Sequence, residues 1–286
     1  MAIIQISTIE QLIAASQNEN HGTSNNYLDI QLLNDIDFAD YSVENYSWPG
    51  FTGLWYANFN GNGHKINNIA YTGTDAWGFF NQLYGSVTNL KLPNMHITST
   101  AHVVGIVENC GACTIQNVHV SGVVESIENH VVALVAHDLD GSALIQECSF
   151  SGTVKGLEYA NTFTAGKTPT TVYNCSIQGT YEVTSNNGEI YIACMTNTEA
   201  TNVIFNGIVK GGINASYHHN WNSTITNCIF VIREGSRGVT TGGGTVNNCY
   251  YDSDVATAAG ISVQGTGATT AQLQSAQWLA EHNFPT

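Results

Sequence analysis

The stretch "TITNCIF", Thr224–Phe230, decides how this chain is interpreted, because it recurs in altered form elsewhere. It returns as "TVYNCSI" at Thr171–Ile177 and as "TVNNCYY" at Thr245–Tyr251. Each copy sets an Asn-Cys pair among apolar residues. Such pairs could serve as metal ligands, disulfide partners, nucleophiles or purely structural residues. An internal repeat has to be traced before any of these is chosen.

Alignment on the Asn-Cys pairs extends the repeat to eight copies, separated by 21, 28, 30, 27, 28, 25 and 21 residues. The next position is Ile, Leu, Val or Cys in every copy. The aligned third positions are Asn68, Asn89, Asn117, Glu147, Asn174, Asn202, Asn227 and Asn248. Several copies carry a glycine about five residues later, namely Gly73, Gly122, Gly152, Gly179 and Gly207.

Within each copy, apolar residues two apart flank a break at the Asn, which indicates two or three short strands separated by corners. Such a unit cannot bury its own apolar face, so neighbouring units must stack at a spacing of ~4.8 Å. We therefore predict an all-β fold, a right-handed single-stranded parallel β-helix of about eight coils. Asn suits the corner because it tolerates a left-handed backbone and its amide can bond to the next coil, forming a ladder.

Both ends of a β-helix expose a sheet edge that needs a cover. We predict an N-terminal cap over 1–26, the β-helix over 27–254 and a C-terminal cap over 255–286. A helix over 7–17 begins in an expected capping box from Ser7 to Glu10, and the tail repeats that logic with Thr269 and Gln272.

Seven Lys and Arg against 22 Asp and Glu give a net charge of −15. A field of that sign repels phosphate backbones and anionic membranes, which excludes nucleic acid as the expected partner. The sequence also lacks a run of 18 apolar residues and the basic start of a signal peptide. We therefore expect neither membrane insertion nor export by the ordinary route.

Further motifs of the sequence are "NDIDF" (Asn34–Phe38), "FNGNGHKINNI" (Phe59–Ile69), and "NCYYDSD" (Asn248–Asp254) followed by "TTAQLQ" (Thr269–Gln274). Together they resemble the GLUG-repeat β-helix proteins of bacteria and viruses. The resemblance covers about residues 27 to 280. It implies a cell-surface, secreted or virion component, often adhesive or carbohydrate-binding. Without an export signal, a phage or viral particle component released by lysis is the expectation.

The cysteines are interpreted as structural. Four of them, Cys148, Cys175, Cys228 and Cys249, stand where other copies have aliphatic residues, so the position favours a small apolar group in a stacked core column. Cys148 and Cys175 are on adjacent coils, near enough in principle for a bridge. Cys110 and Cys113 form a CxxC in an expected loop, a poor zinc site without a second pair of ligands. No metal or cofactor is predicted.

Acidic residues offer an enzymatic alternative. Registering "DAWGFF" on "HVVGIV" and "HVVALV" predicts Asp75, His102 and His130 in one column. Further candidates at the nearby corner are Glu108, His137, Asp138 and Asp140. A glycosidase or lyase would use Asp75, Glu108, Asp138 and Asp140 as its acids. The scarcity of Lys and Arg argues against a uronate lyase, and a solvated polar column is the competing interpretation.

The segment "NASYHHNWNST" supplies candidate ligand-binding residues, Tyr217, His218, His219 and Trp221. Aromatic rings on a rod stack on sugar rings, although they also serve as loop anchors or subunit contacts. The sequence favours a non-enzymatic virion protein, a fibre, spike or decoration module that contacts host surface glycan or neighbouring virion subunits. The sequence does not specify the oligomeric state, and a homotrimer is one assembly open to the chain because β-helical fibres often associate as trimers. A tailspike-like polysaccharide hydrolase or lyase and a bacterial surface adhesin remain the alternatives.

Overall fold

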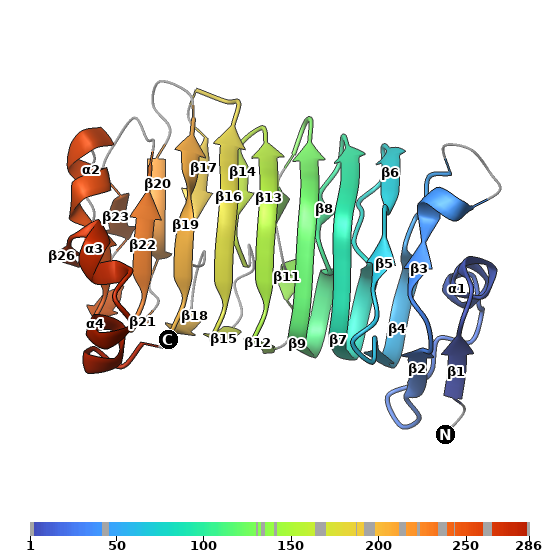
Figure 1. Ribbon diagram of the computed structural model, residues 1–286. Coiled ribbons are helices and arrows are strands. Elements are labelled where there is room, and N and C mark those ends of the chain that lie inside the picture. Colours follow the sequence, from blue (N-terminus) through green and yellow to red (C-terminus); the bar gives the residue numbers. More distant parts are fainter. Residues whose placement is uncertain are drawn as a thin grey trace.

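The computed structural model is a right-handed parallel β-solenoid of about 7 turns (Figure 1), as the repeat predicted. It describes residues 3–41, 46–129, 131–132, 135–139, 142–163, 170–186, 188–191, 198–211, 216–221, 224–233, 239–242, 244–259 and 265–284. The N-terminal end lies at the blue side of the rod and the C-terminal helices at the red side. Each coil has three sides, which we number in chain order around the corner Asn.

Strands of the first side precede the corner: β11 (Val135–Leu139), β12 (Ala143–Gln146), β15 (Thr170–Tyr173), β18 (Thr198–Thr201), β21 (Thr224–Thr226) and β24 (Thr245–Asn247). Strands of the second side follow it: β13 (Ser149–Gly156), β16 (Ser176–Val183), β19 (Ile204–Lys210), β22 (Ile229–Ile232), β25 (Tyr250–Asp252) and β26 (Thr266–Ala268). Two long strands bend around the corner and belong to both sides, β7 (Phe80–Ser99) and β9 (Val107–Ser126).

The third side is a separate sheet of short parallel strands: β8 (Val103–Val104), β10 (Val131–Val132), β14 (Tyr159–Asn161), β17 (Glu189–Tyr191), β20 (Ser216–Trp221) and β23 (Val239–Gly242). The first coils are built from β1 (Ile3–Ile6), β2 (Leu28–Leu32), β3 (Ile36–Asp37), the short helix η1 (Phe38–Asp40), β4 (Phe51–Asn60), β5 (Ile66–Asn67) and β6 (Ala70–Gly73). All pairings between these named strands are parallel and join successive coils.

The corner residues all have the left-handed backbone that the sequence predicted. The φ angles of the eight aligned residues, Glu147 included, run from 45° to 57°. Amide bonds link some of them across coils: Asn117 Nδ2 donates to Asn89 Oδ1 at 2.9 Å, and Asn202 Nδ2 donates to Asn174 Oδ1 at 2.9 Å. A third such bond joins the last two corners, where Asn248 Nδ2 donates to Asn227 Oδ1 at 2.6 Å.

Asn68 was wrongly placed in this ladder. Ala70 pairs with His96, so Asn68 lies level with Asn94 rather than with Asn89. Its Nδ2 donates to Asp37 Oδ1 at 2.7 Å. The reason is the "NGNG" turn, which gives this coil an additional corner: Gly63 N donates to the Asn89 carbonyl at 2.8 Å and occupies the expected place.

The core is filled by in-register columns of buried side chains. One column runs through five coils from β9 to β21 and consists of Ile115, Ile145, Val172, Ala200 and Ile225, all fully buried. Burying one such aliphatic side chain stabilises the fold by about 1.5–3 kcal/mol. The N-terminal coils hold larger rings instead: Trp48, Phe51, Trp55, Phe59, Phe79 and Phe80. The phenyl rings of Phe51 and Phe80 stack with centroids 4.5 Å apart.

Glycines on the second side allow adjacent coils to approach closely. Gly152 pairs with Gly122 and Gly179, and its φ of 147° is rarely adopted by other residues. A Cβ on Gly152 would overlap the carbonyl oxygen of Gly122. Gly122 itself pairs with Met95, so Gly73 does not belong to this column, contrary to the alignment.

Helix α1 (Ile9–Ser16) covers the first coil and buries Leu12. It begins later than predicted, so its N-cap is Thr8, whose hydroxyl accepts from Gln11 N at 3.3 Å, instead of the Ser7–Glu10 pair. At the other end, α2 (Ser253–Ala259) was not anticipated. The tail forms α3 (Thr270–Leu273) and α4 (Ala276–Glu281), and α3 begins with the predicted capping box of Thr269 and Gln272.

Candidate functional site

The predicted column of Asp75 and His102 is shifted by one residue. Trp77 pairs with Val103, and Trp77 N donates to the His102 carbonyl at 2.9 Å, so Asp75 lies level with Ala101. The register then changes, because Phe80 pairs with Val107. The later coil therefore has one more residue between its two paired positions than the earlier coil has between Trp77 and Phe80. Asp75 is exposed, and its backbone carbonyl accepts from Ser99 Oγ at 2.7 Å. His130 lies outside the described residues.

Glu108 is in a different environment from Asp75. It is 7% exposed, and its Oε2 accepts from Asn81 Nδ2 at 2.7 Å and from Asn109 Nδ2 at 2.9 Å. On the next coil, the backbone of Asp138 in β11 pairs with Asn109. The side chains of His137 and Asp138, and all of Asp140, lie outside the described residues, so the structure places two of the four predicted acids.

The aromatic candidates Tyr217, His218, His219 and Trp221 all belong to β20 on the third side. In that sheet Tyr217 pairs with Ile190 of β17 and with Val239 of β23. Their side chains are among those that the structure leaves undescribed. Their use in ligand binding stays a prediction.

The repeat cysteines are buried thiols that form no disulfide, as the apolar column requires. Cys148 and Cys175 are in register on adjacent coils, with Ser176 N donating to the Cys148 carbonyl at 3.0 Å. A hydrogen bond with Cys175, together with burial, raises the pKa of the Cys148 thiol well above its usual value. A protonated buried thiol is a poor nucleophile.

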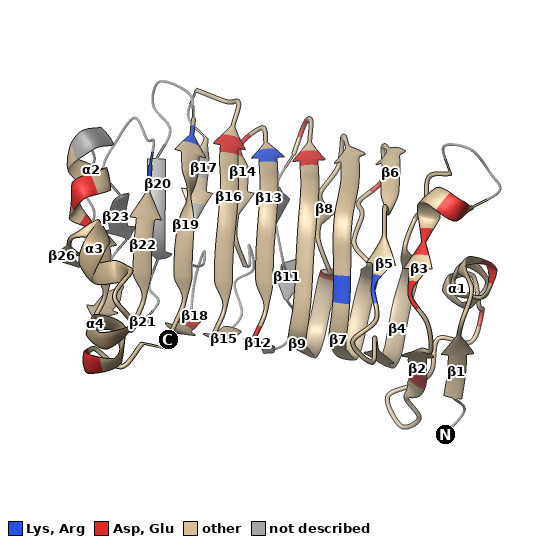
Figure 2. Ribbon diagram, viewed as in Figure 1, with Lys and Arg blue, Asp and Glu red and all other residues tan. Residues whose placement is uncertain are grey.

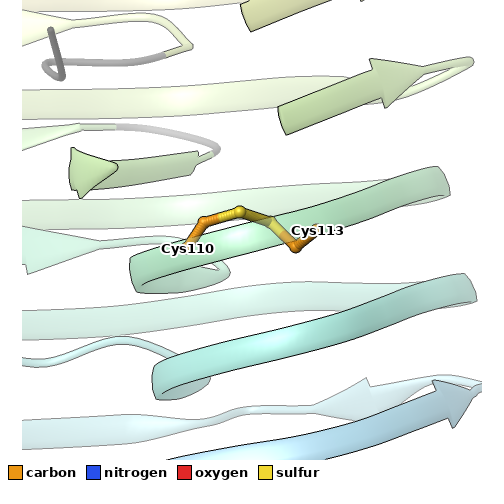
Figure 3. The surroundings of a disulfide bond; sticks show 2 residues. All are labelled: Cys110 and Cys113. Carbon is orange, nitrogen blue, oxygen red and sulfur yellow. A yellow bond between two sulfur atoms is a disulfide. The ribbon is translucent and has the colours of Figure 1, made fainter. Parts of the chain in front are cut away.

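Cys110 and Cys113 form a disulfide (Figure 3), with their Cα atoms 5.7 Å apart. They lie inside β9, not in a loop as predicted. The strand bulges between them: Leu83 of β7 pairs with Cys110, whereas the next residue, Tyr84, pairs with Ala112. The repeat pattern gives no indication of this bulge, so the sequence predicts a loop at these residues.

A groove of about 460 Å³ opens on the second side of the rod, and sequence reasoning missed it. Its lining combines cationic, amide, hydroxyl and apolar groups: Lys65, Lys91, His119, Asn67, Asn94, Ser121, Ser149, Ser151, Pro93 and Val120. The volume is in the range of small-molecule and saccharide sites. A partial signal existed, since Lys91 and His119 each follow a corner Asn by two residues.

Three groove residues stack on adjacent coils, and we call them the cationic column: Lys65, Lys91 and His119. Lys65 pairs with Lys91, and Lys91 pairs with His119. In Figure 2 the two lysines are the blue segment of β7 and the neighbouring blue segment that immediately precedes β5. The column ends at Asp35, whose Oδ2 lies 3.9 Å from Lys65 Nζ.

His119 is held in place by both ring nitrogens. Its Nδ1 lies 2.8 Å from Ser149 Oγ, and its Nε2 lies 3.0 Å from Asn117 Oδ1. The second contact ties the groove directly to the corner ladder. Burial, and secondarily the charge of Lys91, lower the pKa of His119 below its usual value of 6.5. The imidazole is therefore mostly neutral at pH 7, and it becomes a third cation in acid.

The same column continues along the second side and changes character. After His119 it runs through Ser149 and Ser176 to the apolar residues Ile204, Ile229 and Tyr250. The tail packs over this last part, with Tyr250 and Trp278 ring centroids 4.9 Å apart. Figure 1 shows α3 and α4 beside β22, whereas β7 and β9 have no helix in front of them.

Comparisons with known proteins support the fold but do not place the chain in a family. No family model matches the chain, and neither does any curated protein. A solved structure from Bacteroides ovatus, named "putative immunoglobulin A1 protease", is similar over 94% of this chain and 85% of its own, with 15% identity and a TM-score of 0.50. At that identity the likeness concerns the fold alone.

Neither a metal-binding cluster nor a membrane-spanning helix is found among the described residues. No three His, Cys, Asp or Glu side chains within the described ranges are grouped so that they could hold a metal ion. Nor does any described helix have the length and apolarity needed to cross a membrane.

Proposed function

We propose that this protein is a non-catalytic attachment module of a virus or phage particle, a β-helical fibre, spike or decoration protein that contacts host surface glycan. The observation that carries the proposal is the groove on the second side. Its amide and hydroxyl groups, on Asn67, Asn94, Ser121 and Ser151, match the hydrogen-bonding capacity of sugar hydroxyls. Pro93 and Val120 offer apolar surface for the CH faces of a sugar ring.

The resemblance to GLUG-repeat proteins supports the same class of function, since such proteins are surface or virion components. The groove also lies apart from the two predicted acids whose side chains the structure describes, because neither Asp75 nor Glu108 lines it. A repeating rod suits attachment because stacked coils form an extended surface along which ligand-binding side chains can lie in rows.

The experiment is incubation of the protein with candidate host polysaccharides, scored for retention and for new reducing ends. Retention without new ends supports attachment, and retention that disappears when groove residues are substituted assigns it to the groove. Cleavage would overturn the non-catalytic proposal. Absence of both retention and cleavage would leave contact with neighbouring virion subunits as the function.

A tailspike-like hydrolase or lyase is the second candidate, and one observation favours it. Glu108 is a buried carboxylate held by Asn81 and Asn109, and Asp138 follows on the adjacent coil at the position of Asn109. If new reducing ends appear, Glu108→Gln should abolish them while retention of the polysaccharide persists. Unchanged cleavage by Glu108→Gln would remove this residue from the reaction.

A bacterial surface adhesin is separated from a virion protein by location. Peptides of this chain in purified particles support the virion proposal, whereas their presence only in cell-surface fractions supports the adhesin. We also propose a homotrimer, which light scattering of the purified protein tests through its mass in solution. A mass equal to one chain would contradict the trimer and leave the glycan contact unaffected.

A further inference from the structure

We propose that the groove on the second side binds a linear anionic polysaccharide, whose carboxylate or sulfate groups contact the cationic column of Lys65, Lys91 and His119. This inference rests on the proposed glycan contact and names the class of glycan. The ligand chain would run along the rod axis, across the strands, because the three column residues stack on successive coils.

The charge distribution is the first argument. The whole chain has seven Lys and Arg against 22 Asp and Glu, yet two of the seven are direct neighbours in one column. Like charges placed opposite each other on adjacent strands are destabilising. Lys65 has Asp35 as a partner, but Lys91 is flanked along the column by Lys65 on one side and, on the other, by His119, which adds a third positive charge in acid. An anionic ligand would relieve this repulsion.

The change of residue type along the column is the second argument. Where the tail covers the second side, the column residues are apolar, as at Ile204, Ile229 and Tyr250. Where no tail helix lies in front, the column residues are polar, and the last two of them, Lys91 and Lys65, are exposed lysines. The protein therefore puts charge where this surface is open to solvent and to a ligand.

The rest of the groove supplies specificity for a sugar over a bare anion. Asn94 Nδ2 donates to Asn67 Oδ1 at 3.1 Å, and Asn94 N donates to Ser121 Oγ at 3.4 Å. These groups form a second polar row, two residues after Lys65 and His119 and three residues after Lys91. An acidic sugar would place its charged group on the cationic column and its hydroxyls on this row.

Three polymers with one backbone test the proposal: dextran, carboxymethyl-dextran and dextran sulfate. We expect the protein to bind one or both charged polymers and not dextran, and the pair distinguishes carboxylate from sulfate recognition. Replacing Lys91 by Gln should lower the affinity by roughly tenfold or more, the size of a lost charge-assisted hydrogen bond. Lys91→Arg should retain most of the affinity, and added salt should weaken binding to the wild type.

The matched control is Lys155→Gln, which removes a lysine from the same side of the rod but outside the groove. It should leave the affinity unchanged. Equal losses in Lys91→Gln and Lys155→Gln would mean nonspecific attraction and would overturn the site. Failure of both charged polymers to bind would overturn the anionic ligand class. If the protein retains only neutral host glycans, the anionic ligand class is also overturned, whereas the proposed attachment function still stands.

Discussion

Two columns of charged residues lie on the second side of the rod, one at each end of its strands, and they follow opposite rules. The charge ladder near the strand ends alternates in sign over four coils and consists of Glu125, Lys155, Glu182 and Lys210. In Figure 2 it appears as red, blue, red and blue at the upper ends of β9, β13, β16 and β19. In the cationic column at the strand starts, Lys65 and Lys91 repeat the same sign, and protonated His119 joins them in acid.

The charge ladder stabilises the stack of coils. Lys155 Nζ lies 3.0 Å from Glu125 Oε1, and the hydrogen bond to Glu125 raises the pKa of Lys155, with a smaller contribution from the charge of Glu182. The cationic column has no such alternation beyond the contact of Lys65 with Asp35. Because repetition of one sign works against the fold, the neighbouring lysines of the cationic column support the proposed binding site, whereas the alternating charge ladder is explained by its contribution to stability.

The largest effect is expected at the corner that supports the cationic column. Asn117 has a φ of 53° and bonds both Asn89 and His119. We expect Asn117→Ala to lower the free energy of unfolding by about 2–3 kcal/mol, from left-handed strain in Ala and the lost amide bonds. Denaturant unfolding measures the loss. The charge ladder lies away from this corner. Lys155→Gln should therefore change the free energy of unfolding by the same amount in the wild type and in the Asn117→Ala variant.

Asn117→Gly is the control that separates the two causes. Glycine adopts the left-handed conformation without strain, so it should recover about 1 kcal/mol relative to Ala. Equal stability of the Ala and Gly variants would show that the amide bonds, not the backbone, account for the preference for Asn at this corner.

The corners could be predicted from the sequence, but the groove could not. A corner is marked by its own residue, whereas the groove is formed by residues from several coils that are far apart in the sequence. A left-handed residue leaves its own mark, because Asn at a fixed place in each copy is sufficient to locate the corner. The cationic column depends on register between coils. Lys65 enters it only because the "NGNG" turn adds a corner, and Asp75 misses its predicted neighbour because a single extra residue precedes Val107. Neither event changes composition or periodicity noticeably.

The two columns make opposite predictions for charge reversal. Lys155→Glu puts three carboxylates on successive coils and removes the contact with Glu125, so we expect a loss of about 1 kcal/mol in unfolding free energy. Lys91→Glu places a carboxylate between Lys65 and His119, so we expect no loss or a gain of a few tenths of a kcal/mol. Denaturant unfolding at low salt compares both variants with the wild type. A larger loss in Lys91→Glu would contradict our account of the cationic column.

The smallest effect concerns the protonation of His119, which faces Lys91 from β7 and Ser149 from β13, with Asn117 on its own strand. Its pKa is lowered in the folded protein, so the unfolded chain binds more protons and stability contributed by this group falls as the pH drops below about 6.5. The fall ends once the pH is below the folded pKa.

Removing the neighbouring charge by Lys91→Gln should raise the pKa of His119 toward its usual value, although burial will keep it below. Titration of the His119 ring by nuclear magnetic resonance measures this shift, and Lys155→Gln, in the charge ladder, should leave it unchanged. An unchanged pKa in Lys91→Gln would mean that the two groups do not share one electrostatic site.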